Sequence, residues 1–231
     1  MSRFITLLQL DFTLIIRNRI LAVAALITAL YAAILQLLPE ENFSLVITTL
    51  IFTDPVMLGF MFTGVMVLFE KSGNTLQALS VSPVRPGEYL WSKALCLTLI
   101  ALVAALIMAV AGVGLKFNAL YLTIAVICSS LLFVFIGFAG VTRVQTFNQF
   151  FIIIPLLMIP GFLPFLNFFG ITDTWLWYFI PTQACLLLFT ATFDPAMQWT
   201  EIQIWYVSLY LPLSIFTSYF LALKMWQRQI Q

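Results

Sequence analysis

The chain has 231 residues, of which 63% are hydrophobic and only 8% charged, with a net charge of +1. Because a soluble domain carries roughly 25% charged residues, this composition excludes a soluble globular protein and indicates that lipid covers most of the surface. The chain has no histidine, so the commonest general base and metal ligand is missing.

The reactive side chains form no catalytic or metal-binding pattern. The cysteines Cys96, Cys128 and Cys185 lie far apart in apolar stretches, without the paired spacing of a metal or redox motif. No paired carboxylates or nucleophile constellation appears at a common depth. We therefore expect no enzyme activity, no catalytic, metal or cofactor-binding residue, and no nucleic-acid partner.

Residues 2–18 are predicted to form an amphipathic helix. Phe4, Leu7, Leu8 and Phe12 follow one another at near-helical spacing, with charged residues interrupting the apolar run. Such a helix lies along the membrane surface. It serves either as a simple N-terminal anchor or as a moving part of a mechanism.

Six longer apolar runs follow. A membrane-spanning helix needs roughly 20 apolar residues, and the runs that meet this length cover residues 20–38, 45–69, 94–115, 119–141, 149–168 and 204–226. The fifth run contains Pro155, Pro160 and Pro164 and is predicted to bend or stop near Pro160 to Pro164. The fold class is thus an all-α integral membrane protein with one permease-like domain, 1–231.

The apolar segment 175–193 decides the number of spans. Pro181 and the cluster Trp175, Trp177 and Tyr178 suit a re-entrant or interfacial helical segment between spans five and six. With six spans, nine basic residues share one side with both termini, and Lys116 alone lies on the other side. The nine are Arg3, Arg17, Arg19, Lys71, Arg85, Lys93, Arg143, Lys224 and Arg228. By the positive-inside rule both termini are cytoplasmic, whereas a seventh span would move two of the nine outside.

The connection 70–93 between the second and third spans differs from a plain linker. Thr75 can cap a short helix that ends before Ser82-Pro83, because the residue before a proline is disfavoured in the α region. Leu76 and Leu79 then lie on one face of that helix. Exposed leucines on a cytoplasmic loop indicate a docking surface for another protein.

This loop resembles the first cytoplasmic loop of permeases of the second type of ATP-binding-cassette (ABC) exporters. The shared pattern is Glu-Lys, then Gly-x-Thr-Leu-x-x-Leu-x-Val-Ser-Pro-Val-x-Pro-x-Glu-Tyr-Leu, then Ser-Lys. The stretch Trp177-Tyr178-Phe179-Ile180-Pro181-Thr182-Gln183 is similar to the segment before the last span of the same family. The members that it resembles most are fluoroquinolone or multidrug export permeases, and the resemblance covers the whole chain.

The resemblance implies a multi-pass permease of the cell membrane. It would pair with a second permease, either another copy or a sister protein, and dock onto separate ABC ATPase subunits. The chain contains no Gly-x-x-x-x-Gly-Lys-Ser/Thr phosphate loop, so ATP would be used by the partner subunit. The residues that match the coupling segment of the family are Glu70, Lys71, Gly73, Thr75, Leu76, Leu79, Ser82 and Pro83.

Asp54 is the acidic residue inside a predicted span, and charge in the hydrocarbon region is costly enough to mark a functional candidate. It either faces a cavity between two permeases and contacts a cationic or polar substrate, or is hydrated or paired within the protein. The family places its pathway along spans two and five, which adds Phe52, Phe60, Asn148, Phe151 and Met158 as lining candidates. For any single one of these side chains, contact with lipid or ordinary packing is the favoured explanation. A pathway lined by Phe and Met suits a bulky apolar drug-like or lipid-like substrate.

Two other functions fit parts of the sequence. An ion-coupled secondary carrier would place several ionisable groups near the midplane, often in repeated halves, whereas this chain has one such Asp and no visible repeat. A non-transporting membrane scaffold would explain a docking loop but would leave Asp54 without a role. Co-purification of an ATPase distinguishes the exporter from both.

Overall fold

The computed structural model describes residues 3–37, 43–73, 84–194 and 196–230, and these residues form helices joined by short loops. In a bilayer each backbone N–H and C=O must be bonded within its own segment, which favours helices for apolar runs of this length. The helices are α1 (Arg3–Arg17), α2 (Ile20–Leu37), α3 (Phe43–Val56), α4 (Phe62–Ser72), α6 (Pro86–Val113), α7 (Ala119–Thr142), α8 (Phe147–Phe162), α9 (Phe165–Phe168), α10 (Pro181–Phe193), α11 (Glu201–Trp205) and α12 (Leu211–Ile230). The π-helical segments η1 (Met57–Met61) and η3 (Tyr206–Tyr210) and the 3₁₀ helix η2 (Trp175–Phe179) complete the set.

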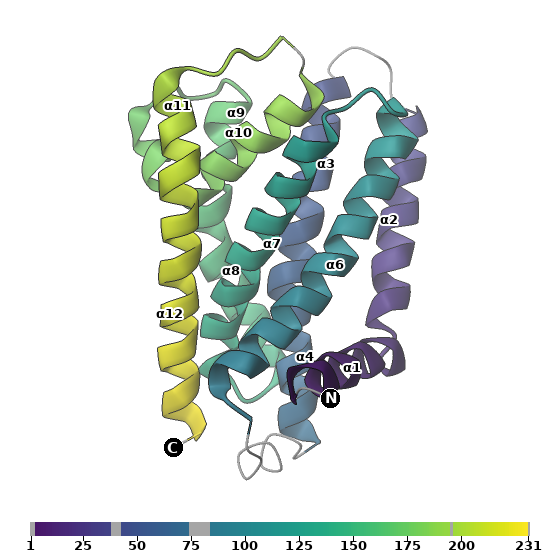
Figure 1. Ribbon diagram of the computed structural model, residues 1–231, viewed down its shortest axis with the longest axis vertical. Helices are drawn as coiled ribbons and strands as arrows, with labels where there is room; N and C mark the ends of the chain where they lie inside the picture. The colour runs from purple at the N-terminus through teal and green to yellow at the C-terminus, as the bar shows by residue number, and fades with distance from the viewer. Residues whose placement is uncertain (1–2, 38–42, 74–83, 195, 231) are drawn as a thin grey trace.

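The long helices run side by side along the longest axis, and α1 lies across one end of the bundle (Figure 1). Both ends of the chain, the foot of α4 and the start of α6 lie at this same end, which we call the basal end. The short helices α9 and α10 lie toward the opposite end.

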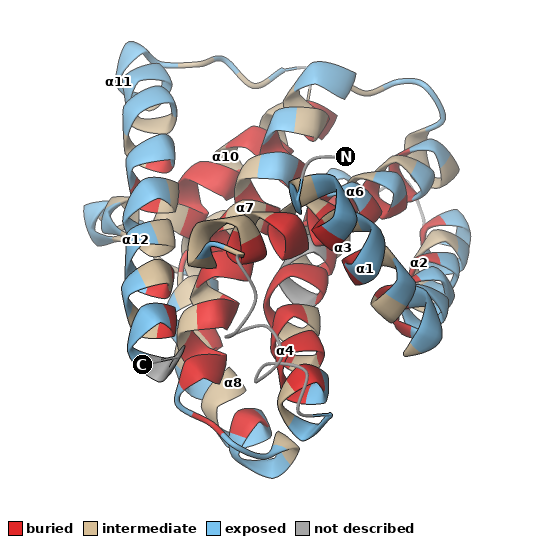
Figure 2. Ribbon diagram, turned by 60° about the horizontal axis from the view of Figure 1, so that its bottom comes forward, coloured by how far each residue is buried: buried red, intermediate tan, exposed pale blue. Residues whose placement is uncertain are grey.

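Helix α7 is the centre of the bundle. It contacts α3, α4, α6, α8, α10 and α12, and Figure 2 shows its buried surface continuing onto α3, α4 and α10. The segment η1 packs closest to it: a Cβ on Gly59 would lie 3.1 Å from the backbone oxygen of Ser130, and one on Gly137 would lie 2.9 Å from that of Phe60. Glycine at these two positions therefore lets the two backbones approach directly.

Within the described residues, five helical segments are long and apolar enough to cross a membrane: 20–37, 43–72, 86–113, 119–142 and 201–228. The outer faces of α2 and α12 are exposed yet apolar, as expected for surfaces in contact with lipid (Figure 2). The predicted span 149–168 is divided instead. Helix α8 ends at Phe162 and α9 begins at Phe165, because Pro164 cannot supply the N–H that a continuous helix needs.

The segment 175–193 forms η2 followed by α10, with Pro181 as the first residue of α10. At thirteen residues α10 is too short to span a bilayer by itself. It packs against α3 and α7 inside the bundle.

Candidate functional site at the basal end of the bundle

The predicted coupling residues divide into two groups. Glu70 and Lys71 lie on the last turns of α4, and Gly73 caps its C-terminal end. Thr75, Leu76, Leu79, Ser82 and Pro83 lie outside the described residues. The described residues continue from Val84, and α6 begins two residues later at Pro86, earlier than the predicted span boundary at residue 94.

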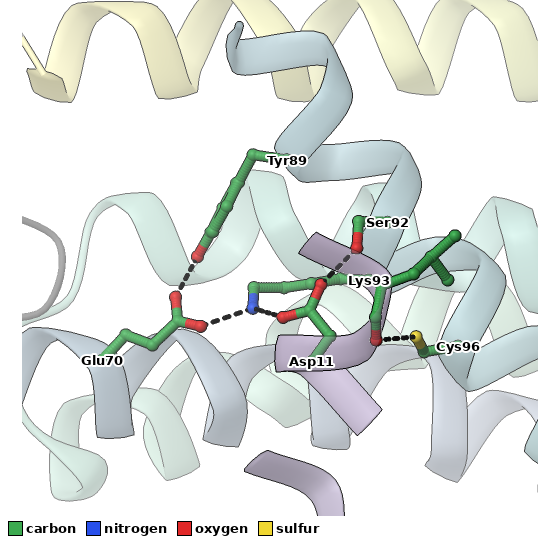
Figure 3. A network of polar contacts seen from close by, with 7 residues as sticks. Asp11, Glu70, Tyr89, Ser92, Lys93 and Cys96 are labelled. Carbon is green, nitrogen blue, oxygen red and sulfur yellow. Dashed lines mark hydrogen bonds and ion pairs between the residues drawn. The ribbon is translucent and has the colours of Figure 1, made fainter. Parts of the chain in front are cut away.

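A buried ion network joins the two ends of this loop (Figure 3). The ammonium group of Lys93, on the second turn of α6, is inaccessible to solvent and lies between two carboxylates. Its Nζ donates to Oδ1 of Asp11 at 2.6 Å and to Oε1 of Glu70 at 2.5 Å. These three side chains come from α1, α4 and α6, so the network fastens three helices together.

Two further residues of α6 extend the network. The hydroxyl of Tyr89 donates to Oε2 of Glu70, and the hydroxyl of Ser92 donates to Oδ2 of Asp11 at 2.5 Å (Figure 3). The ring of Tyr89 lies 4.6 Å from the Lys93 ammonium, within range of a cation–π contact. It also stacks on Trp226 of α12, with ring centroids 4.7 Å apart. The last helix is thereby packed onto the same cluster.

Lys71 makes a second connection at the foot of α4. Its Nζ donates to the backbone oxygens of Val141, at 3.0 Å, and Val144, at 2.8 Å. These oxygens lie at the C-terminal end of α7, where carbonyl groups lack helical partners and the helix dipole favours a cation. Next to Lys71, the ring of Phe69 packs edge-on against Phe147 in the first turn of α8, with centroids 5.4 Å apart.

The far end of the loop is fixed by a helix cap. The backbone N–H of Arg85 donates to the side chain of Glu88 at 3.0 Å, and Pro86 occupies the first turn of α6. Proline at this position loses no helical hydrogen bond and sets the backbone angle that the helix needs. The chain therefore leaves α4 and enters α6 through two fixed points.

We call the five residues Asp11, Glu70, Tyr89, Ser92 and Lys93 the basal network. Removing one partner from a buried ion pair typically costs about 3–5 kcal/mol, because the remaining charge stays buried without compensation. Such a network does not slide gradually; the helices keep it intact and move together, or it breaks.

Most of the basal network was not predicted as functional. The charge pattern places Lys93 among the basic residues of the cytoplasmic side, but the structure buries it completely, so it adds nothing to the surface charge. Asp11 is one of the charged residues that interrupt the apolar run of α1 in the sequence, yet it lies on the buried face of that helix with Leu7 and Ile15. The sequence does contain a signal for this position: Leu7, Asp11 and Ile15 are four residues apart, which places them on one face of a helix.

The predicted pathway residues fall into two sets. Asn148 and Phe151 are exposed on α8. Phe52, Asp54, Phe60 and Met158 are buried inside the chain. Phe52 packs against three other aromatic rings, and Phe60 stacks on Phe150 with centroids 5.8 Å apart. The set is thus not brought to one surface of the single chain.

Asp54 is a buried acid whose hydrogen-bonding capacity is not fully used. The side chain is only 2% exposed, and Oδ2 has no hydrogen-bond partner among the described residues. Three residues further along the chain, the α-helical pattern gives way to η1. Single π-helical turns of this kind are frequent at functional sites.

Comparison with known proteins agrees with this architecture. The model of the fluoroquinolones export permease protein family matches residues 2–231. Two proteins named fluoroquinolones export permease protein, from Mycobacterium tuberculosis strains CDC 1551 / Oshkosh and ATCC 25618 / H37Rv, are each 30% identical to this chain over 198 residues. Each match covers 84% of this chain and 82% of the relative. With its long apolar helices, the chain is a multi-pass membrane protein and belongs to the fluoroquinolones export permease protein family.

Proposed function

We propose that the chain is the membrane-spanning subunit of an ABC exporter and pairs with a second permease and two separate ATPase subunits. The observation that carries this proposal is the basal network, which joins both ends of the loop between α4 and α6 to each other and to α1. A loop that merely linked two spans would need no such anchorage. A loop that receives mechanical force from a partner does.

In this mechanism the ATPase subunit binds the loop through Leu76 and Leu79, and ATP-driven closure pushes the loop toward the bundle. The ion pairs of Lys93 carry the displacement into α1, α4 and α6. Lys71 carries it to the end of α7. The helices then move as connected bodies and open the pathway alternately to the two sides.

The proposed topology has six spans with both termini in the cytoplasm. The fifth crossing in chain order is α8 continued by α9, and η2 with α10 is the re-entrant segment. Two features support this arrangement: both ends of the chain lie at the basal end (Figure 1), and exposed basic residues lie near that end. These basic residues include Arg17, Arg19, Lys224 and Arg228, whereas Lys116 follows α6 at the opposite end.

The proposed substrate is a bulky, mainly apolar molecule of the drug-like or lipid-like class, moved out of the cytoplasm. The names of the Mycobacterium relatives refer to fluoroquinolones export, and an aromatic drug of that kind would suit the Phe-rich surroundings of Asp54. The role proposed for Asp54 is a polar contact to a cationic group of the substrate. The exposed Asn148 and Phe151 would face the second permease.

The proposal is tested by purifying the tagged chain from native membranes and assaying ATPase activity in what elutes with it. Leu76→Asp/Leu79→Asp is compared with Leu115→Asp/Ile171→Asp, which changes two exposed apolar residues away from the basal end. We expect an ATPase subunit to co-elute with the wild type and with the control, and to be lost from the loop variant. If no ATPase co-elutes with the wild type, or if the loop variant retains it, the proposal fails.

A further inference from the structure

A long apolar groove lies on the outside of the bundle between α2 and α6. Its two ridges are Leu21, Ala25 and Ala29 on α2 and Leu99, Val103 and Ile107 on α6. Within each ridge the residues are four apart, so each ridge follows one face of its helix. The groove encloses about 400 Å³.

The floor of the groove is closed by tight packing of the same two helices. Ala24 and Thr28 of α2 and Ile100 and Ala104 of α6 are each at most 8% exposed, although they lie beside ridge residues that are about half exposed. The hydroxyl of Thr28, the only polar group in the lining, is bonded to the backbone oxygen of Ala24 at 2.9 Å. The groove therefore offers no free polar group to a ligand and accepts an apolar one.

The shape of the groove matches a chain rather than a compact molecule. From Leu99 to Ile107 it follows the helix for eight residues, about 12 Å at 1.5 Å per residue. It runs along the bundle axis, in the direction in which lipid tails lie. At its basal end it is bounded by Phe12 of α1, the helix that crosses beneath α2 and α6 (Figure 1).

Two cations stand at this basal end. Arg17 is in the last turn of α1, and Arg19 lies two residues before the lining residue Leu21. Both are exposed, and among the described residues neither guanidinium forms a hydrogen bond or ion pair. They are therefore free to bind an anion at the level where α1 meets the start of α2.

The backbone at Arg19 is held in an unusual conformation. Its φ of 58° lies in the left-handed region, where a residue with a long side chain is rarely found. The turn is fixed by its own bonds: the N–H of Arg19 donates to the oxygen of Ile16, and the oxygen of Arg19 accepts from Val23. Glycine or asparagine would suit this turn better, yet the position carries an arginine, whose exposed side chain adds a second cation beside Arg17.

We propose that the groove and its two arginines form a binding site for one anionic phospholipid. An acyl chain would lie between the ridges, and the headgroup phosphate would contact Arg17 and Arg19. Basic residues next to a groove between membrane helices are the arrangement that recognises anionic headgroups. In the proposed topology this lipid belongs to the cytoplasmic leaflet, but the site itself does not depend on the exporter function.

The test is native mass spectrometry of the full chain in a nonionic detergent, after adding an equimolar mixture of phosphatidylglycerol and phosphatidylcholine with identical palmitoyl and oleoyl chains. We expect one retained lipid per chain, with phosphatidylglycerol favoured by at least about fivefold. Equal retention of the two lipids by the wild type would overturn the proposal without any variant being needed.

Two variants separate the headgroup from the acyl chain. Arg17→Gln/Arg19→Asn should abolish the preference for phosphatidylglycerol, and asparagine tolerates the left-handed backbone at position 19. Ala25→Phe/Ala29→Phe should fill the groove and lower retention of both lipids about fivefold. The matched controls are Arg228→Gln and Ala22→Phe, which change an exposed arginine and an exposed alanine outside the groove. If either variant behaves like its control, the proposed site is wrong.

Discussion

Glu70 and Lys93 are 23 positions apart in the chain, yet their charged atoms lie 2.5 Å apart, and the loop between α4 and α6 begins and ends beside them. Neither charge is accessible enough to be stabilised by water. The ion pair therefore holds the two ends of the loop together.

Lys93→Met should destabilise the protein by about 3–5 kcal/mol, because it leaves Asp11 and Glu70 buried side by side without a cation. The measurement is the temperature at which half of the purified chain is lost from the monodisperse peak in size-exclusion chromatography. Lys224→Met, at an exposed position on α12, is the control and should leave that temperature unchanged. Equal behaviour of the two variants would show that the network contributes nothing.

Glu70→Gln should separate ATP hydrolysis from transport. Lys93 keeps its contact to Asp11 in this variant, so the fold should persist, while the connection from α4 to α6 loses its charge. We expect transport into inside-out vesicles to fall on the order of tenfold, since residues along a coupling path change the coupling by about 0.5–2 kcal/mol. The ATPase activity of the purified complex should remain.

Glu201→Gln, at an exposed position on α11 away from the basal end, is the control for this comparison. It should change neither activity. A Glu70→Gln variant in which ATPase activity and transport fall in parallel would argue for a lost subunit contact instead of lost coupling.

Hydropathy could predict the long spans because lipid contact selects an apolar composition residue by residue. It could not predict the basal network, because Asp11 meets Ser92 and Lys93 across 81 and 82 positions of the chain. The residues next to a charged residue near a helix end do not reveal whether its side chain faces water or pairs with a distant residue. The π-helical segment η1 was not predicted either, because hydropathy does not distinguish a π-helical turn from an α-helical one.

The divided fifth span was partly predictable. Proline removes a helical hydrogen bond and kinks or breaks a helix. Helix α8 continues through Pro155 and Pro160 and ends at Phe162, within the stretch Pro160 to Pro164 where a bend or stop was expected. The buried position of Phe52 and Phe60 was not predictable, because an aromatic residue in an apolar span packs equally well on protein or on lipid. Only the neighbouring helices decide between the two.

Gly64→Ala should destabilise the chain by about 1–3 kcal/mol, because a Cβ at this position would lie 1.9 Å from the ring of Phe150. That ring would have to leave its stack on Phe60. Gly64→Ala/Phe150→Leu should recover part of the loss by making room. The measurement is again the midpoint temperature of the monodisperse peak.

The control for overpacking is Gly161→Ala. A Cβ there would meet its nearest neighbour, the ring of Phe133, at an ordinary distance of 3.6 Å. It should leave the midpoint unchanged or raise it slightly, since alanine restricts the unfolded chain. Equal stability of Gly64→Ala and Gly161→Ala would contradict a role of the Gly64–Phe150 contact in holding the helices together.

Single cysteines in a chain with its three native cysteines replaced by alanine test the six-span topology. A cysteine at Gln227 or Ser72 should react with a membrane-impermeant maleimide only when the cytoplasmic face is accessible, in inside-out vesicles. A cysteine at Asp173 or Thr200 should react in intact cells. Labelling of Gln227 and Ser72 from opposite sides would require an odd number of crossings between them and would overturn the proposed topology.

Asp54→Asn should raise stability while lowering transport. The carboxylate is buried and Oδ2 has no partner among the described residues, so replacing it by an uncharged group of the same shape removes a desolvation cost. If the charge binds a cationic group of the substrate, uptake of a cationic drug into inside-out vesicles should fall about tenfold. This is the order expected for losing a charge-assisted hydrogen bond. Uptake of a neutral analogue should persist.

Thr48→Val is the matched control, because the hydroxyl of Thr48 is equally buried and unpartnered on the same helix. It should leave uptake of both drugs unchanged. Equal uptake of the cationic drug by wild type, Asp54→Asn and Asp54→Ala at matched expression would assign the acid no part in substrate binding, and a loss that affects both drugs alike would indicate a structural role in the helix around η1.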